Sequence, residues 1–286
     1  MVFYRLKIYQ LNIDEERNEL TNKQINSIEI MLFRNSLLLT RKIHTLINHK
    51  LYPLDNRQSE TYNQLVKNSR EEFLSTGCLY LTNFLTQSTL STILQEINSI
   101  VMHSSQTLFQ SYVQHTENLY NISKNFNEIE SSSKTIIAYD QIPTDSLLRK
   151  IYLSNSLIQF LTDVIEIYPQ LYPSCDKLGA LYINIYRQSN KLSWHTDHSH
   201  FFVNLLLQQA SNNNEGIFEY KTDKIISRND FQSGGLVLFN GRNYVHRVTE
   251  IHSSKLPRIN AILTYDCTRE HYLSDYVLQK FFGRTT

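Results

Sequence analysis

The sequence predicts an α+β protein in which a helical N-terminal half packs against an antiparallel sandwich or open barrel formed by the C-terminal half. Apolar residues in the N-terminal half recur at spacings near three, four and seven, as on one face of a helix. After Leu178, short β-branched or aromatic runs alternate with polar turns, as in successive hairpins. Seven glycines and five prolines are too few for long flexible linkers, so a single domain is expected.

Four stretches of the N-terminal half have helical patterns. Residues 25–51 carry the apolar side chains of an amphipathic helix or helix pair. Further helices are expected in QSETYNQLVKNSREEFLSTG, where Gly77 is a suitable stop, in TQSTLSTILQEINSIVMH and in TDSLLRKIYLSNSLIQFLTDVIEIY. Between them, CLYLTNF and SKTIIAYDQI have the composition of short strands.

The strands of the C-terminal half follow one another closely. They are predicted in LGALYINIYR, FFVNLLLQQ, GIFEYK, GLVLFN and RINAILTYD, with turns at SNNNEG, SRNDFQSGG and NGRN. We therefore divide one domain of residues 1–286 into four parts. These are a helical N-terminal extension (1–70), a helical support with short strands (71–175), the β core (176–268) and a C-terminal tail (269–286).

Charge and cysteine usage exclude several kinds of partner and location. The formal net charge is +1 and no dense Lys/Arg cluster stands out, so neither nucleic acid nor a membrane surface is expected as a partner. A small molecule or a peptide is expected instead. Three widely spaced cysteines form neither a disulfide framework nor a CxxC site, which favours the cytoplasm. Charges interrupt the N-terminal stretch, and no apolar run approaches the roughly 18 residues of a membrane span.

The stretch LSWHTDHSH, residues 192–200, gathers three histidines and an aspartate beside the only tryptophan. Side chains alternate between the faces of a strand, so His195 and Asp197 project to the same side. The candidate for a third ligand is His246, in FNGRNYVHRVTEI, directly after the strand GLVLFN. Two histidines and one carboxylate leave coordination positions open, which suits a non-heme Fe(II) that must also hold a co-substrate and oxygen.

A candidate anion-binding residue follows the third ligand. Arg258 stands twelve residues after His246, at the start of the strand RINAILTYD. Its guanidinium is suited to bind a carboxylate in bidentate fashion, although a structural salt bridge is the alternative. Asn260 shares the strand face of Arg258 and is expected to reach the co-substrate or the substrate.

With these residues in place, the sequence resembles the iron(II)/2-oxoglutarate-dependent dioxygenases, and within them the BesD/HalD-like branch of free-amino-acid halogenases and related hydroxylases. The branch pattern is followed by WHTD, FFVNLLLQQ, GIFEY, LVLFNGRNYVHRV and RINAILTYD, and the resemblance covers roughly residues 70–268. It implies a double-stranded β-helix, a jelly-roll or cupin-like core, with Fe(II) on His195, Asp197 and His246. It also implies 2-oxoglutarate on Arg258, O2 as the oxidant, and Arg242 as a support residue of the co-substrate site.

One departure from the branch bears on the reaction. The halogenases have Gly in place of the metal-binding carboxylate, which makes room for chloride, whereas this chain has Asp197. The resemblance therefore implies hydroxylation of an unactivated C–H bond, with release of succinate and CO2. The substrate implied is a free amino acid or a similar small polar molecule, although a peptide or a carrier-bound group fits the helical front half equally well.

Four further residues are candidates for the substrate pocket. They are Trp194, His198, His200 and Glu219. Extra histidines beside a metal site more often line the pocket or orient a ligand than bind the metal. Trp194 is expected to pack at the mouth of the barrel. Glu219 is expected either near the pocket or, equally, as a solvent-exposed carboxylate on its strand.

Two other functions remain open on the sequence alone. A zinc hydrolase would use the HTDHSH cluster, but the order of its histidines and aspartate differs from the H-x-H-x-D-H of metallo-β-lactamase-like enzymes. A non-catalytic β-sandwich binding protein would contain the same sheet, but it gives no reason for Arg258 to follow His246 at this spacing. The oligomeric state is not indicated by the sequence.

Overall fold

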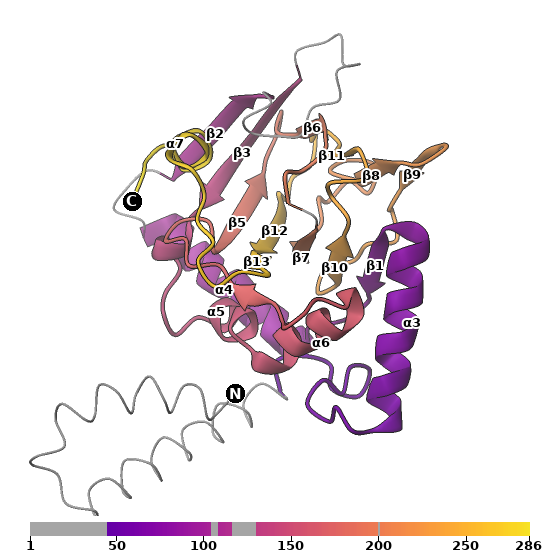
Figure 1. Ribbon diagram of the computed structural model, residues 1–286. Helices are drawn as coiled ribbons and strands as arrows, with labels where there is room; N and C mark the ends of the chain where they lie inside the picture. The colour runs from indigo at the N-terminus through magenta and orange to yellow at the C-terminus, as the bar shows by residue number, and fades with distance from the viewer. Residues whose placement is uncertain (1–44, 104–107, 116–129, 200) are drawn as a thin grey trace, which may run out of the picture. The chain divides into compact units, whose positions relative to one another are not determined.

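The computed structural model describes residues 45–103, 108–115, 130–199 and 201–286 (Figure 1). The helices are α3 (Glu60–Thr76), α4 (Gln87–His103), the 3-10 helix η1 (Tyr139–Gln141), α5 (Leu147–Tyr152), α6 (Asn155–Ile165) and α7 (Asp275–Phe282). The strands are β1 (Cys78–Leu81), β2 (Phe109–Gln114), β3 (Ser131–Ile137), β4 (Tyr172–Pro173), β5 (Leu181–Tyr186), β6 (Leu192–His195), β7 (Phe202–Gln208), β8 (Phe218–Lys221), β9 (Ile225–Ser227), β10 (Leu236–Phe239), β11 (His246–Val248), β12 (Arg258–Leu263) and β13 (Tyr265–Asp266).

Two antiparallel sheets form the core of the molecule. The larger sheet has seven strands in the order β1-β10-β7-β12-β5-β3-β2, and the smaller has four in the order β6-β11-β8-β9. Apolar side chains of both sheets meet in one cluster, with Phe239 from β10, Phe218 from β8 and Val248 from β11. Side chains alternate between the two faces of each strand, and the inward-pointing set of each sheet supplies this shared interior. The predicted α+β class with a two-sheet core is confirmed.

Helices α4, α5 and α6 lie together against the larger sheet (Figure 1). The apolar face of α4 buries Leu90, Ile93 and Ile97, so the periodicity seen in the sequence is the packing surface of the helix. The smaller sheet packs against the opposite face of the larger sheet, and the candidate site lies between the two sheets. None of the helices in the described ranges combines the length and the apolar composition needed to cross a lipid bilayer.

The predicted end of α3 is confirmed in detail. The Ser59 side chain accepts a hydrogen bond from the backbone N–H of Tyr62, which caps the start of the helix. Gly77 ends it with a φ of 71°, in the left-handed region. A Cβ on Gly77 would also overlap the ring of Tyr244, so glycine is required at this position for two reasons.

Two of the predicted helices differ from the structure. The helix expected across residues 144–168 is divided at Ser154, whose hydroxyl accepts a 3.4 Å hydrogen bond from the Leu157 N–H and starts a new helix. Most of the helix expected at residues 25–51 lies outside the described residues. The last part of that range, from residue 45 onward, forms turns and an isolated bridge between Ile47 and Leu85.

Among the elements that the sequence does not predict, two lie beside the site. Strand β2 pairs with β3 at the edge of the larger sheet. Helix α7, within the expected C-terminal tail, buries Leu278 and Phe282 against a cluster that includes Ile136 of β3. Together they extend the inner face of the larger sheet beyond the predicted β core.

Candidate active site

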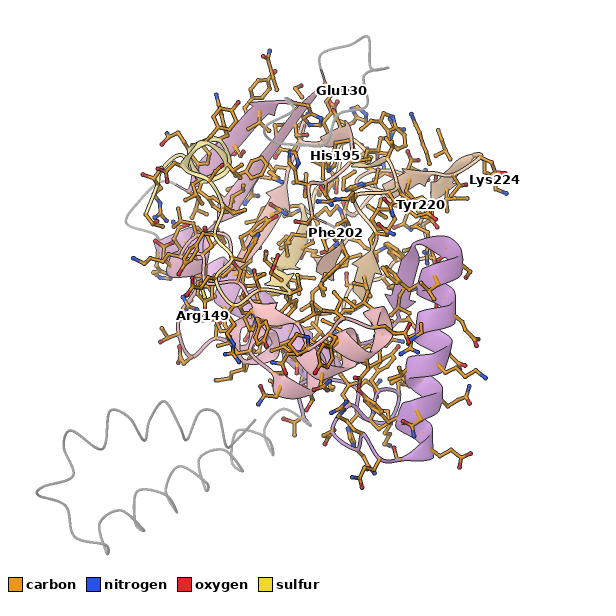
Figure 2. All side chains as sticks on the ribbon, viewed as in Figure 1. Glu130, Arg149, His195, Phe202, Tyr220 and Lys224 are labelled. Carbon is orange, nitrogen blue, oxygen red and sulfur yellow. The ribbon has the colours of Figure 1, made fainter. Side chains whose placement is uncertain are left out.

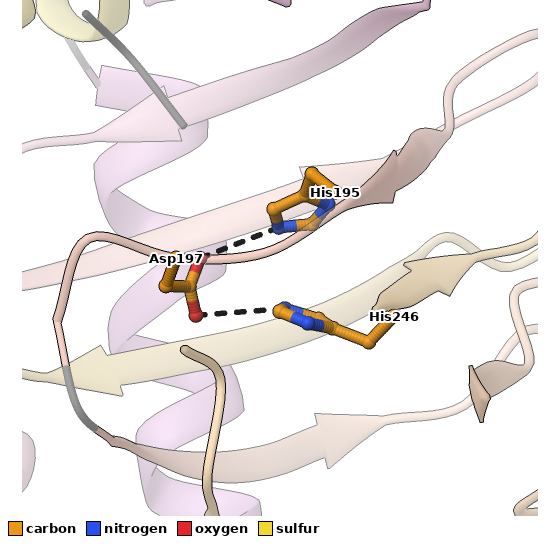
Figure 3. A group of neighbouring side chains, drawn as sticks. All are labelled: His195, Asp197 and His246. Atoms are coloured by element: carbon orange, nitrogen blue, oxygen red, sulfur yellow. Dashed lines mark ion pairs between the residues drawn. The ribbon is translucent and has the colours of Figure 1, made fainter. Parts of the chain in front are cut away.

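The pairing of β6 with β11 brings two histidines together. His195 and His246 are directly opposite each other in the antiparallel ladder, and such partners point to the same face. Their ring centroids are 4.1 Å apart. The carboxylate of Asp197 completes the group, with 3.4 Å from Oδ1 to His195 Nε2 and 3.5 Å from Oδ2 to His246 Nε2 (Figure 3).

The outer nitrogen of each imidazole is held by the backbone. His195 Nδ1 donates to the Ser193 carbonyl at 2.7 Å, and His246 Nδ1 donates to the Tyr244 carbonyl at 3.0 Å. Each bond places the proton on Nδ1 and leaves the lone pair of Nε2 directed toward Asp197. Three ligand atoms, all within 4.8 Å of one another, are therefore ready to hold one divalent cation.

The surroundings of His246 and Asp197 also favour the protonation states that bind a metal. Burial and the neighbouring His195 lower the pKa of His246 to about 4, so this imidazole is neutral at neutral pH. Burial by itself would raise the pKa of Asp197, but the two histidines and Lys134 outweigh that effect and hold the pKa below its ordinary value. Neutral imidazole and ionised carboxylate are the protonation states that bind metals.

A glycine makes room for the carboxylate. The backbone N–H of Asp197 donates to the Gly241 carbonyl at 2.9 Å, which brings the aspartate against the turn after β10. A Cβ on Gly241 would overlap Oδ2 of Asp197 and lie 2.9 Å from its Cγ. The turn therefore fits the aspartate only when residue 241 has no side chain.

We expect Gly241→Ala to weaken metal binding by about 10- to 100-fold, the range seen when a group that positions a ligand is lost. The added methyl group pushes the Asp197 carboxylate out of line with the two imidazoles. Titration with Fe(II) under anaerobic conditions measures the effect. Asn243→Ala, an exposed change in the same turn, is the control and is expected to retain wild-type affinity. Equal metal affinities for the two variants would contradict this role of Gly241.

Arg258 is a buried cation at the start of β12. It lies opposite Tyr186 of β5 and is 3% exposed. Burial lowers the pKa of Arg258 to about 10, so the guanidinium remains charged. Its Nε has no hydrogen-bond partner, and within the described residues no carboxylate lies within 4.0 Å of its nitrogens. An unpaired buried charge is costly, which favours a binding role over a structural salt bridge.

The surroundings of Arg258 are fixed by two loops. The carboxylate of Glu215 accepts backbone hydrogen bonds from residues 252–254, which joins the loop after β7 to the loop before β12. The next residue, Gly216, passes close to the arginine, because a Cβ there would lie 3.1 Å from Cδ of Arg258. The stem of Arg258 is thus confined while its Nε remains without a partner.

Asparagines line the same face of the larger sheet. Asn260 donates from Nδ2 to Oδ1 of Asn204 at 3.0 Å, and it lies opposite Asn184 in the ladder between β12 and β5. The Oδ1 atoms of Asn260 and Asn184 are buried and have no hydrogen-bond partner among the residues that the structure describes. The polar interior therefore offers both an unpaired cation and unpaired acceptors.

Two residues proposed for the substrate pocket lie on the opposite face of their strands. The Trp194 ring packs between the cations of Lys221, 4.3 Å from its centroid, and Arg247, at 4.4 Å. Glu219 accepts a 2.7 Å hydrogen bond from Arg247 Nε. Because strand side chains alternate, the neighbour of inward-pointing His195 must point outward. We therefore leave Trp194 and Glu219 out of the pocket.

The loop after Asp197 contains the remaining sequence candidates. Arg242 is exposed, and its guanidinium donates to the His198 carbonyl, with 2.8 Å from Nε. It therefore anchors this loop to the turn after β10. His198 is exposed, and His200 lies outside the described residues.

Two residues that the sequence analysis does not foresee lie beside the metal ligands. His115, after β2, has its ring centroid 5.5 Å from that of His195, and its Nε2 is 2.6 Å from Ser132 Oγ. Burial, followed by the nearby His195, lowers the pKa of His115 to about 3. Lys134, in β3, is 7% exposed. His115 follows β2 and Lys134 lies in β3, and the pairing of these strands with the core depends on contacts distant in sequence.

No protein-family profile and no curated protein sequence matches the chain. Solved structures do match. A prolyl hydroxylase from Trichoplax adhaerens, in complex with a hypoxia inducible factor oxygen degradation domain peptide, has a TM-score of 0.50 and 17% identity, covering 73% of this chain and 91% of that one. The α-ketoglutarate-dependent epimerase SnoN of nogalamycin biosynthesis has 0.51 and 12%, covering 71% and 83%. The carbocyclase SnoK of that biosynthesis has 0.50 and 10%, covering 77% and 92%.

These similarities establish the fold. The chain has the double-stranded β-helix of the 2-oxoglutarate/Fe(II) oxygenases, as the sequence analysis predicted. By their descriptions, the matched proteins include a hydroxylase, an epimerase and a carbocyclase, so the fold by itself does not select one reaction. The function must be argued from the site.

Proposed function

We propose that this protein is an Fe(II)/2-oxoglutarate-dependent oxygenase that hydroxylates an unactivated C–H bond of a small polar substrate. The observation that carries the proposal is the combination of two sites. The Nε2 atoms of His195 and His246 converge on the Asp197 carboxylate between the two sheets. Arg258 is a buried cation on the same inner face, and no carboxylate of the described residues pairs with it. A metal ligand set alone would fit a hydrolase, whereas the unpaired arginine calls for a second, anionic ligand.

The donor set fits iron and a keto acid. Two imidazoles and one carboxylate hold Fe(II) and leave positions for a bidentate co-substrate and for oxygen. When bound, iron with 2-oxoglutarate and O2 supplies the oxidation, in which the substrate gains one oxygen atom while 2-oxoglutarate becomes succinate and CO2. The chain itself supplies the ligand geometry, the binding of both organic molecules and the exclusion of water.

Named side chains perform these roles. The Arg258 guanidinium pairs with the distal carboxylate of 2-oxoglutarate, which provides the anion that the structure leaves missing. The backbone bonds to Nδ1 keep both imidazoles in the orientation that the metal requires. The aromatic rings of Phe202 and Phe239, with centroids 5.5 and 5.1 Å from that of His246, exclude water around this imidazole.

The substrate proposal is a free amino acid or a derivative, in line with the BesD/HalD-like resemblance. The unpaired Oδ1 atoms of Asn184 and Asn260 support it. These atoms accept hydrogen bonds, and 2-oxoglutarate has no N–H group to donate. An ammonium group of the substrate would satisfy them. A succinate-release screen over amino acids and small amines, with Fe(II), 2-oxoglutarate and oxygen, tests the proposal. Turnover that needs neither oxygen nor 2-oxoglutarate would point to a hydrolase instead.

We expect the product to be heavier by one oxygen and to contain no chlorine, even in excess chloride. Asp197 fills the coordination position that a halide would need, and its negative charge disfavours an anionic ligand. Mass spectrometry of the turnover mixture, with and without chloride, makes the measurement. Asp197→Gly is expected to yield an inactive or weakly hydroxylating enzyme, because a halide also needs hydrogen-bond donors. A chlorine isotope pattern in the principal wild-type product would refute Asp197 as an iron ligand.

A further inference from the structure

We propose that Lys134 binds a carboxylate of the primary substrate, on the opposite side of β5 from Arg258. This inference rests on the proposed function, because it concerns the second organic molecule in the same site. It narrows the substrate class to small molecules that carry a negatively charged group.

The position of Lys134 follows from the strand register. In β3, Ile136 lies opposite Asn184 of β5, and Lys134 lies opposite Ser111 of β2. Residues two apart in a strand share a face, so Lys134 points to the same side as Asn184, into the interior that contains the metal ligands. Helix α7 packs over this lysine, and the ring centroid of Phe281 on α7 is 5.8 Å from the ammonium.

This lysine is buried without a partner. It is 7% exposed, and in the part of the chain that the structure describes, no carboxylate lies within 4.0 Å of its ammonium and no acceptor is hydrogen-bonded to it. Lysine is almost never fully buried in proteins unless it is paired. The cation–π contact between the Lys134 ammonium and the Phe281 ring stabilises the charge by about 0.5–2 kcal/mol. This is less than the hydration free energy that the ammonium loses on burial.

Metal binding makes the need for an anion greater. The nearest opposite charge is that of Asp197, which interacts with Lys134 at longer range. Once Asp197 ligates a divalent metal, its charge is neutralised, and the ammonium then faces another cation across a medium of low dielectric constant. The two cationic side chains and the metal carry four positive charges. Asp197 and 2-oxoglutarate supply three negative ones, so one monoanionic group balances the site.

2-Oxoglutarate is not the anion that Lys134 requires. In the proposed function, its keto acid end would bind the metal, and Arg258 would bind its other carboxylate. Arg258 is on β12 and Lys134 is on β3, strands that flank β5 on opposite edges. The two cations therefore serve two molecules, and the carboxylate at Lys134 fixes the end of the substrate that is not oxidised.

The test uses propionate as the probe and the full chain loaded with Mn(II) and saturating 2-oxoglutarate. Mn(II) accepts the same ligands as Fe(II), and its unpaired electrons shorten the NMR relaxation times of protons near it. We expect the relaxation of propionate protons to be enhanced in the wild type, while the neutral propionamide shows no effect. Lys134→Met keeps the aliphatic stem and removes the charge, and it is expected to weaken propionate binding by at least about tenfold, as for the loss of one charge-assisted hydrogen bond.

Two variants serve as controls. Lys134→Arg retains the charge and is expected to bind propionate more tightly than Lys134→Met. Lys224→Met, in the exposed turn between β8 and β9 (Figure 2), is expected to behave as the wild type. Mn(II) and 2-oxoglutarate binding are measured first in every variant. Absence of both in the wild type would overturn the proposed function itself.

The remaining outcomes concern Lys134 alone. The inference is wrong if metal and 2-oxoglutarate bind but the relaxation of the propionate protons is not enhanced. It is also wrong if Lys134→Met enhances this relaxation as much as the wild type does. If Lys134→Met loses 2-oxoglutarate and not propionate, the lysine serves the co-substrate and the inference is likewise wrong.

Discussion

Replacing His246 with alanine is expected to abolish oxygen-dependent succinate formation and to weaken Fe(II) binding by more than about 100-fold. The imidazole is one of three protein ligands, so its loss exceeds the effect of losing a group that only orients a ligand. The variant is expected to remain folded, because all the apolar side chains of the two-sheet core, Phe218 and Phe239 among them, are retained. Metal content after anaerobic loading and succinate release measure the two effects.

His252→Ala is the matched control for this change. His252 is a histidine shortly after the same strand, β11, but its side chain is 69% exposed and lies beside Glu250. This variant is expected to keep wild-type iron content and turnover. Wild-type turnover in a folded His246→Ala protein that still carries iron would show that the metal is bound elsewhere.

Arg258→Met is expected to separate ligand binding from stability. Two charge-assisted hydrogen bonds to the 2-oxoglutarate carboxylate are lost, so the affinity for 2-oxoglutarate falls by about 100-fold. The free energy of unfolding of the ligand-free protein is expected to stay the same or to rise, because an unpaired buried charge is removed. Binding at about 100 times the dissociation constant stabilises a protein by about 2.7 kcal/mol, and the variant is expected to lose this gain.

Thermal unfolding with and without 2-oxoglutarate, on metal-loaded protein, makes the measurement. Arg247→Met provides the control, since Arg247 pairs with Glu219 on the outer face of the smaller sheet. That variant should retain stabilisation by 2-oxoglutarate. A fall in ligand-free stability of Arg258→Met, with unchanged stabilisation by 2-oxoglutarate, would instead identify Arg258 as a structural residue.

Local patterns were sufficient to predict the three candidate metal ligands. The two-residue spacing of His195 and Asp197 and the strand before His246 are short-range features, and the structure brings all three residues together. Strand alternation also determines where Trp194 points, because it neighbours His195 in β6. Its outward position could have been inferred from the same rule that grouped His195 with Asp197.

Other features required information that no local pattern contains. Lys134 is a functional candidate only because β3 joins the edge of β5 and turns this residue inward, and sequence periodicity does not specify which strands pair. Helix α7 is an intermediate case. Ser274 accepts a hydrogen bond from the Val277 N–H at its start, and Gly283 ends it with a φ of 72°. These capping signals were present in the sequence, but the short apolar run between them was assigned to a tail.

One anaerobic titration distinguishes an iron/2-oxoglutarate site from other metal sites. Fe(II) is added to the metal-free protein with and without 2-oxoglutarate, and the visible charge-transfer absorption of iron chelated by a keto acid is followed. We expect one iron per chain and an absorption band that appears only when both iron and 2-oxoglutarate are present. Iron binding with no band at saturating 2-oxoglutarate, or no iron binding at all, would contradict the assignment of this site to an oxygenase.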